Sequence, residues 1–357
     1  MNPLLTVENL SKSYASSDGM FGGARVARVV SGVSFSLARG DVFALVGESG
    51  SGKTTIGRML LRLIEADEGV IRFDGIDVRA LDPSSLRRLR RRMQIILQDP
   101  FGSLDPRIRI GQAIAEPIRL HRLRPAHEVQ DRVAELLDLV GLNAGHAQRY
   151  PHEFSGGQRQ RVAIARALAV EPELMVCDEP VSALDLSIQA QVLNLLADLR
   201  ARLDVSYVFI SHDMAVVRHL ATHVGVLYAG RLVETGPSET VLADPRHPYT
   251  RMLLAATPSP VPGSRPDRPA IIGDPPSPFA TDPHCRFASR CAHVIDACRS
   301  VDPPLIPVAP ASRSAACLRS MELAPFTARA DSEAMMTDAY RRRLGLLRRA
   351  RLPADQA

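Results

Sequence analysis

The sequence has no tryptophan, and aromatic residues make up only 4% of its 357 residues. It also lacks any apolar run of about eighteen residues or more, the length that a helix needs to cross a bilayer. Its N-terminus, MNPLLTVENLSKSY, has neither the basic start nor the long apolar stretch of a signal peptide. We therefore expect neither a membrane-spanning helix nor a signal peptide.

Lysine is nearly absent as well. Of the 44 basic residues only two, Lys12 and Lys53, are lysines. The guanidinium group of arginine is planar and extended, whereas the ammonium group of lysine is a compact charge. Lysine is therefore expected to persist where the chemistry needs the smaller group. The formal net charge of +5 would permit an acidic partner. Much of the excess lies in local arginine clusters, however, and this weakens a global nucleic-acid interpretation.

The length permits one large domain with appendages or two ordinary domains. Apolar runs that favour buried strands, DVFALV, LMVCD and YVFISH, alternate with helical patterns over residues 54–64, 112–140 and 184–203. Strands that alternate with helices predict an α/β fold with a parallel sheet. Residues 15–27 are expected to form a surface loop between two strands.

A phosphate-binding loop is predicted where the strand DVFALV ends. The octet GESGSGKT begins at Gly47 and fits the P-loop pattern between a strand and a helix. Gly47, Gly50 and Gly52 let the backbone curl so that its N–H groups face the phosphates. Lys53 would neutralise the outer phosphates, and Thr54 would ligate Mg²⁺. The other predicted nucleotide ligands in this segment are Glu48, Ser49, Ser51 and Thr55. A chance glycine-rich turn is the alternative.

A P-loop alone leaves kinases, GTPases, helicases and transporters open. Residues 154–161, FSGGQRQR, resemble the signature peptide of the ABC ATPase family. In that family the signature caps the ATP that the facing subunit holds, which implies that Ser155, Gly156, Gly157 and Gln158 act in trans. Exposed N–H donors and the positive end of the helix dipole would meet the γ-phosphate. The alternative is a simple helix cap.

The segment LMVCDEP, residues 174–180, is an apolar strand that ends in two carboxylates and resembles the Walker B strand of the same family. The resemblance implies that Asp178 holds Mg²⁺ and that Glu179 polarises the attacking water as general base. Cys177 is expected to be a small buried hydrophobe.

Four further positions match motifs of the family. The SALD segment, which ends at Asp185, resembles the D-loop, and His212 matches the switch histidine that contacts the γ-phosphate. Gln98 matches the Q-loop glutamine that reaches Mg²⁺ and the water, and Tyr14 matches the aromatic residue that stacks on adenine. The resemblance therefore implies ATP and Mg²⁺ as cofactors, catalytic roles for Glu179, His212, Gln98 and Lys53, and Mg²⁺ ligation by Thr54, Gln98 and Asp178.

The sequence also resembles one branch of that family. The peptides QDPFGSLDPR and HPYTRMLLAATPSP, followed by GDPPSPF and CRFASRC, are similar to those of the oligopeptide, dipeptide and nickel importers. The branch implies an ATP-hydrolysing importer subunit for di- or oligopeptides or related small solutes, peripheral on the cytoplasmic face of the cell membrane. The implied partners are a second ABC ATPase subunit, two membrane permeases and an extracytoplasmic solute-binding protein. Leu97 departs from the usual phenylalanine of the branch.

Two other function classes share part of this pattern. A soluble ABC ATPase that acts on DNA or ribosomes shares every nucleotide motif, but such proteins usually pair two cassettes in one chain or insert long coiled coils, and this chain shows one cassette and no heptads. A regulatory binder with dead catalysis is disfavoured because the catalytic residues are all present. The solute, and whether the second ATPase is a copy or a different subunit, stay open.

The resemblance implies a P-loop NTPase fold: a RecA-like core with an antiparallel β subdomain, a helical subdomain, and a small Cys/Pro-rich C-terminal appendage. Residues 1–258 would form the ATP-binding domain, with the helical subdomain at about 99–170. Residues 259–323 hold twelve of the 27 prolines and four of the five cysteines, and they would form the oligopeptide-transporter C-terminal region. Residues 324–357 would be a basic tail, helical or disordered.

The cysteines of the appendage, Cys285, Cys291, Cys298 and Cys317, lack the two-residue spacing of common zinc ribbons. Their positions resemble those that hold a [4Fe–4S] cluster in some dipeptide importer ATPases. Unmetallated thiols and zinc remain the alternatives. In the tail, six arginines between residues 341 and 351 are interleaved with leucines, so the tail would either lie on anionic lipid or form a solvated helix.

Overall fold

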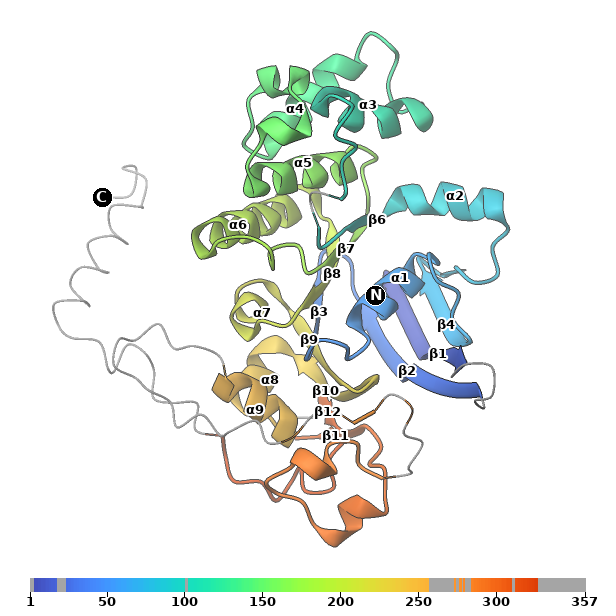
Figure 1. Cartoon of the computed structure of the whole chain (residues 1–357), viewed down its shortest axis with the longest axis vertical. Coiled ribbons are helices and arrows are strands. Elements are labelled where there is room, and N and C mark those ends of the chain that lie inside the picture. The colour runs from blue at the N-terminus through green and yellow to red at the C-terminus, as the bar shows by residue number, and fades with distance from the viewer. Residues whose placement is uncertain are drawn as a thin grey trace, which may run out of the picture.

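The computed structural model describes residues 3–17, 24–99, 102–256, 273, 276–277, 279, 284–309 and 312–326. These residues form an eight-stranded and a four-stranded sheet with helices around them (Figure 1). The strands of the larger sheet, in spatial order, are β11 (Ile306–Val308), β12 (Arg313–Ala315), β10 (Arg231–Pro237), β9 (His223–Tyr228), β3 (Val42–Val46), β8 (Ser206–Ser211), β7 (Leu174–Asp178) and β6 (Met93–Ile96).

The predicted parallel sheet is confirmed. The five strands from β9 to β6 pair in parallel, in the order β9-β3-β8-β7-β6. Every residue of β3, β7 and β8 is buried, as expected for parallel strands that helices cover on both faces. Parallel strands end at the same edge of a sheet, so the segments that follow β3, β6, β7 and β8 are brought together there.

The smaller sheet is antiparallel and contains β2 (Ala24–Leu37), β1 (Leu5–Ser17), β4 (Glu68–Phe73) and β5 (Ile76–Asp77). The prediction of a loop over residues 15–27 is wrong at both ends. The ladder between β1 and β2 continues from Tyr14, which pairs with Ala27, to Ser17, which pairs with Ala24. Backbone pairing does not require apolar side chains, so the small and polar residues here extend the hairpin.

Nine α-helices lie in the described ranges: α1 (Lys53–Leu60), α2 (Pro83–Arg92), α3 (Ile110–Leu120), α4 (Val129–Leu139), α5 (Gly156–Leu168), α6 (Leu186–Leu203), α7 (Met214–Leu220), α8 (Ser238–Ala243) and α9 (Pro248–Ala256). The single helix predicted over residues 112–140 is wrong, because α3 ends at Leu120 and α4 begins at Val129. Arg122, just after α3, has a left-handed φ of +51°, which no helix continues, and Pro125 follows before α4 begins. No helix of the described ranges is long and apolar enough to span a bilayer.

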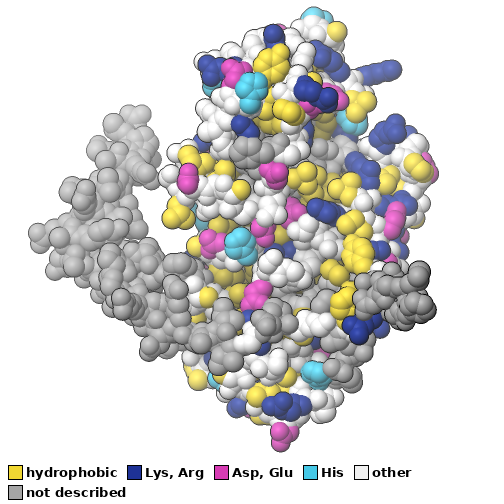
Figure 2. Space-filling model, in the orientation of Figure 1, with side chains coloured by type: hydrophobic (Ala, Val, Ile, Leu, Met, Phe, Trp, Pro, Cys, Tyr) yellow, Lys and Arg dark blue, Asp and Glu magenta, His cyan; other side chains and the backbone are white. Residues whose placement is uncertain are grey.

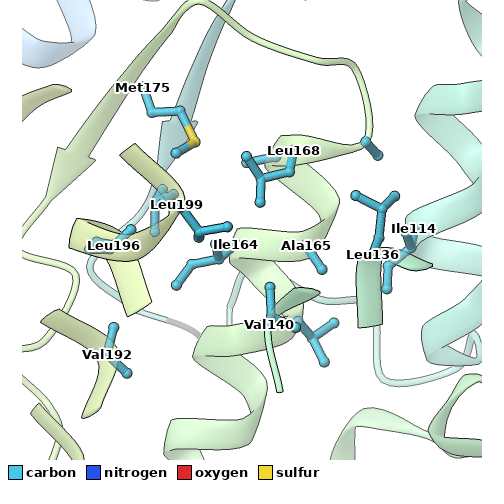
Figure 3. Close-up of a cluster of buried hydrophobic side chains, with 14 of the residues drawn as sticks. Ile114, Leu136, Val140, Ile164, Ala165, Leu168, Met175, Val192, Leu196 and Leu199 are labelled. Carbon is cyan, nitrogen blue, oxygen red and sulfur yellow. The ribbon is translucent and has the colours of Figure 1, made fainter. Parts of the chain in front are cut away.

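The helices from α3 to α5 share one core with the larger sheet. Figure 3 shows Ile114 and Leu136 together on the side of α5 that carries Ala165, while Ile164 lies beside Leu196 and Leu199 of α6 on the other side. Met175 of β7 belongs to the same cluster. The helical region is therefore packed directly against the strand that ends at Asp178.

The C-terminal appendage is described over residues 284–309 and 312–326, and this part has no separate core. Its strand β12 pairs with β10, with Ala315 opposite Glu234, and β11 pairs with β12. Phe287 is buried against Tyr228 and Tyr249. The proposed boundary between residues 258 and 259, and the basic tail after residue 326, lie outside the described residues.

Candidate functional site

The loop between β3 and α1 depends on glycine at two close approaches. A Cβ atom on Gly47 would lie 2.1 Å from the carbonyl oxygen of Leu227, and one on Gly52 would lie 2.6 Å from that of Val29. Gly52 also has φ of +104°, which disfavours any other residue. The loop therefore curls tightly over the end of β3, as the P-loop pattern predicts.

Lys53 is buried at the start of α1. Its Nζ donates to the carbonyl oxygens of Gly47 and Glu48, at 2.8 Å each. Burial lowers the pKa of Lys53, while the nearby carboxylates of Glu179, Asp178 and Glu48 oppose that shift. A cation held in a poorly solvated site attracts a polyanion more strongly than it would in water.

A hydroxyl and a carboxylate meet beside the lysine. Thr54 Oγ1 donates to Asp178 Oδ1 at 2.9 Å, and Asp178 is only 3% exposed. Burial raises the pKa of Asp178, and the hydrogen bond from Thr54 opposes this shift. Oxygen donors of these two kinds fit Mg²⁺, which is held in proteins by one or two carboxylates with substrate phosphates.

Three predicted catalytic residues converge from three neighbouring strands. Gln98 follows β6, Glu179 follows β7 and His212 follows β8. Gln98 Nε2 donates to Glu179 Oε2 at 3.0 Å, and His212 Nδ1 lies 3.3 Å from Glu179 Oε1. Glu179 has φ of +46°, a left-handed conformation that is costly for a residue with a Cβ and is concentrated at functional sites.

The signature segment forms the N-terminus of α5. Ser155 Oγ accepts from Gln158 N at 3.3 Å, and Gln158 Oε1 accepts from Ser155 N at 3.0 Å, which makes a capping box. Gly157 packs against α6, because a Cβ there would lie 2.3 Å from Ile188 Cγ2. Ser155 and Asp185, the residue that precedes α6, are both exposed. The predicted signature and D-loop therefore present two adjacent helix N-termini at the surface.

Two family models match the sequence. The ABC transporter model matches residues 30–182, and the model for the oligopeptide/dipeptide transporter C-terminal region matches residues 233–298. A putative peptide import ATP-binding protein of Brucella ovis is 50% identical over 317 residues, which span 89% of this chain and 98% of that protein. The chain belongs to the ATP-binding subunits of the ABC peptide importers. This ABC ATPase is also 44% identical to the dipeptide transport ATP-binding protein DppF of Escherichia coli K12. The match extends over 303 residues, which span 85% of this chain and 91% of DppF.

Solved structures agree with the predicted fold. The ABC ATPase is similar to cbiO1 of Clostridium perfringens, part of the transporter complex cbiONQ, with a TM-score of 0.60 and 26% identity over 68% of this chain and 92% of that chain. It is also similar to the ATP-binding cassette MJ0796 in a dimeric post-hydrolysis state bound to ADP and Pi, with a TM-score of 0.59 and 26% identity over 66% of this chain and 98% of that chain. The predicted P-loop NTPase fold is confirmed.

Tyr14 lies on β1 of the ABC ATPase and is 42% exposed. Lys12 Nζ lies 5.4 Å from the centroid of its ring and also bonds to Asp67 Oδ1 at 2.7 Å. Lys12 is thus a partly exposed cation that is paired with a carboxylate, while Lys53 is buried. The exposure of Tyr14 suits the predicted stacking on adenine.

The four cysteines of the C-terminal appendage lie in one small region. Cys285 N donates to the carbonyl oxygen of Cys298 at 3.1 Å, and the nearby Cys285, Cys291 and Cys298 help to raise the pKa of Cys317. Burial raises the pKa of both Cys285 and Cys317 to about 11. Across the described part of the chain, however, no group of three or more His, Cys, Asp or Glu side chains is arranged to hold a metal ion. The arrangement gives the [4Fe–4S] prediction no support.

Two residues at the P-loop were not predicted. Tyr249 and Arg290 both contact Glu48, and they lie 201 and 242 residues after it. The motifs HPYTRMLL and CRFASRC contain them, and these motifs were matched to the family without a role for either side chain. A contact between residues so far apart leaves no periodicity or spacing that could have indicated it.

Proposed function

We propose that this ABC ATPase hydrolyses ATP to drive uptake of di- or oligopeptides, or related small solutes, through separate membrane permeases. The observation that carries the ATPase part is the convergence of Gln98, Glu179 and His212 beside the buried Lys53. The match over residues 233–298, and the printed names of the Brucella and Escherichia relatives, support peptides as the cargo.

Different residues of the site would bind the phosphates, hold Mg²⁺ and catalyse hydrolysis. Lys53 and the backbone N–H groups between residues 49 and 55 would bind the β- and γ-phosphates of ATP. Thr54, Asp178 and Gln98 would hold Mg²⁺, which neutralises charge on the phosphates when it is bound. Glu179 would accept the proton of the attacking water. Gln98 and His212 would fix the position of its carboxylate, and His212 would also contact the γ-phosphate.

The signature acts on a second subunit in this proposal. The exposed N-termini of α5 and α6, which carry Ser155 and Asp185, would face the nucleotide of another ABC ATPase subunit. Leu186, at the start of α6, is 83% exposed, and burial of such a side chain would favour association. Two ATP molecules would then be enclosed between two subunits, and hydrolysis would let the subunits separate.

The remaining parts of the chain would connect this motor to the membrane. We assign residues 1–258 to the ATP-binding domain and residues 259–323 to the transporter-specific C-terminal region. The helical region at about 99–170 would dock on two permeases at the cytoplasmic face of the cell membrane. An extracytoplasmic solute-binding protein would deliver the solute. A [4Fe–4S] cluster in the C-terminal region stays a prediction.

Nothing in the structure or the comparisons favours the alternative of an ATPase that acts on nucleic acid or ribosomes. Figure 2 shows one face of the molecule, where Lys and Arg side chains are interleaved with Asp, Glu and hydrophobic side chains. A nucleic-acid surface would instead collect basic residues in one patch or stripe.

The trans arrangement predicts that Ser155→Arg abolishes turnover by the assembled transporter but leaves ATP binding by the isolated chain unchanged. Ser155→Arg places a bulky side chain at the N-terminus of α5, so we expect loss of ATP turnover by the assembled transporter. The Kd of the isolated chain for ATP should stay within about twofold of wild type, because the P-loop of the same chain is untouched. Fluorescence titration with a nucleotide analogue measures this Kd, and phosphate release measures turnover.

Ser155→Ala is the matched control, because both changes remove the helix cap, at a cost of about 1 kcal/mol. The thermal stabilities of the two variants should therefore fall alike. If Ser155→Arg weakens ATP binding to the isolated chain as strongly as loss of Lys53 does, the signature acts on the nucleotide of its own chain and the trans arrangement is wrong.

A further inference from the structure

Glu48, the second residue of the P-loop, is held by the C-terminal part of the chain. Its backbone N–H donates to the hydroxyl of Tyr249 at 2.8 Å. Its carboxylate accepts two hydrogen bonds from Arg290, with Nη1 at 2.8 Å from Oε2 and Nη2 at 2.9 Å from Oε1. A bidentate arginine–carboxylate pair fixes the relative orientation of the two groups as well as their separation.

Arg290 is buried within the appendage, where several residues fix its side chain. It ends the short helix η3 (Ala288–Arg290), and its side chain is 2% exposed. Nη1 also lies 3.3 Å from the hydroxyl of Tyr228, and the guanidinium lies near the ring of Phe287. Among the described residues its Nε has no hydrogen-bond partner, so Glu48 is the chief acceptor for a buried cation. Such a cation is costly to leave unpaired.

Tyr249 is fixed from a different direction. It lies in the first turn of α9, where Glu234 of β10 accepts from the backbone N–H groups of Arg246 at 2.7 Å and His247 at 3.0 Å. His247 Nδ1 in turn accepts from Tyr249 N at 3.1 Å. Burial lowers the pKa of His247 to about 3, so this acceptor stays neutral at physiological pH. The helix start, and with it the tyrosine hydroxyl, is anchored to the sheet.

The same residue of the loop is bound to the lysine. Lys53 Nζ contacts the carbonyl oxygen of Glu48, so Glu48 uses its N–H, its carbonyl and its carboxylate on three protein partners. Its N–H is thereby committed to Tyr249 rather than to a phosphate. Glu48, which was predicted as a nucleotide ligand, instead has the contacts of an anchor for the loop.

We propose that Arg290 of the appendage and Tyr249 of α9 are positioning residues that hold the P-loop in its phosphate-binding shape, so that the appendage, through Arg290, contributes to the affinity for ATP. The inference rests on the proposed ATPase function. A loop that is already ordered loses less conformational freedom when it binds its ligand. Neither side chain touches the reacting atoms, so their loss should weaken ATP binding and leave the chemical step largely intact.

The test measures the Kd for ATP, and the KM and kcat of turnover, for substituted full-length chains. Arg290→Gln should raise Kd and KM about tenfold, the size of one lost charge-assisted hydrogen bond. Values of kcat should stay within about twofold, which marks lost binding rather than lost chemistry. Tyr249→Phe, which removes one acceptor and is the milder change if Arg290→Gln folds poorly, should raise both constants about threefold.

A double substitution shows whether Arg290 acts through Glu48. If it does, Arg290→Gln combined with Glu48→Gln should raise Kd no further than Arg290→Gln alone, since coupled residues are not additive. Arg290→Lys should bind ATP more tightly than Arg290→Gln but less tightly than wild type, because lysine restores the positive charge without the bidentate geometry of the guanidinium group.

Arg231→Gln is the matched control. Arg231 forms an ion pair with Asp302 of the appendage and has no bond to the P-loop among the described contacts. It should lower thermal stability without a change in Kd. Equal rises in Kd for Arg231→Gln and Arg290→Gln would overturn the inference, as would an unchanged Kd in Arg290→Gln. A wild-type chain that binds no ATP would instead overturn the proposed function itself.

Discussion

Glu179→Gln should abolish ATP turnover. General-base catalysis contributes about 100- to 10,000-fold to rate, and the amide that replaces the Glu179 carboxylate cannot accept the proton of the attacking water. We expect kcat to fall by at least about 100-fold. The binding groups of Lys53 and Thr54 are untouched, so the Kd for ATP should change by less than about threefold. Phosphate release and nucleotide titration measure the two quantities.

Glu135→Gln provides the control for removal of one carboxylate. The Glu135 side chain is 64% exposed on α4, where it pairs with Arg132, and an exposed pair of this kind contributes little to stability. Its turnover should match wild type. Turnover of Glu179→Gln close to that of wild type would show that another group acts as the base, and the assigned role of Glu179 would be wrong.

Lys53→Met should remove measurable ATP binding at ordinary nucleotide concentrations. The ammonium group would form charge-assisted hydrogen bonds to two phosphates, each of which contributes about 1.5–3 kcal/mol. Their loss should raise Kd by about 100-fold or more. The substitution also removes the bonds from Nζ to the carbonyl oxygens of Gly47 and Glu48, so part of the effect comes from a looser loop. Equilibrium titration measures the change.

Lys12→Met removes the other lysine of the chain and is a natural control. The Lys12 side chain is 15% exposed and pairs with Asp67, whose side chain is 42% exposed. An ion pair with a solvent-exposed partner is worth about 0–1 kcal/mol. Its effect on Kd should therefore stay below about fivefold, the equivalent of that energy. A Lys53→Met chain that binds ATP as well as Lys12→Met does would contradict the assignment of the P-loop.

The sequence was sufficient to predict the residues that line the phosphate end of the site. Each motif is a short local segment, and a parallel sheet brings the segments after its strands to one edge. This is why Gln98, Glu179 and His212 could be grouped although they are spread over more than 100 residues of chain. Their contacts in the structure follow from that topology.

The sequence was insufficient wherever pairing between distant segments decides the structure. The hairpin of β1 and β2 extends through polar residues that were assigned to a loop, because backbone hydrogen bonds hold it. The appendage joins the sheet through Ala315 and Glu234, which are 81 residues apart. The contact of Arg290 with Glu48 is of the same kind. None of these pairs produces a pattern within one segment.

The central claim, an ATPase that drives peptide import, is tested most directly by turnover in reconstituted membranes. The chain would be combined with candidate permeases and a candidate solute-binding protein from the same genome, and ATP hydrolysis would be measured with and without a dipeptide. We expect hydrolysis to require the permeases, to rise with peptide-loaded binding protein and to disappear in Glu179→Gln. Hydrolysis that ignores the membrane subunits and peptide, but rises with nucleic acid or ribosomes, would contradict it.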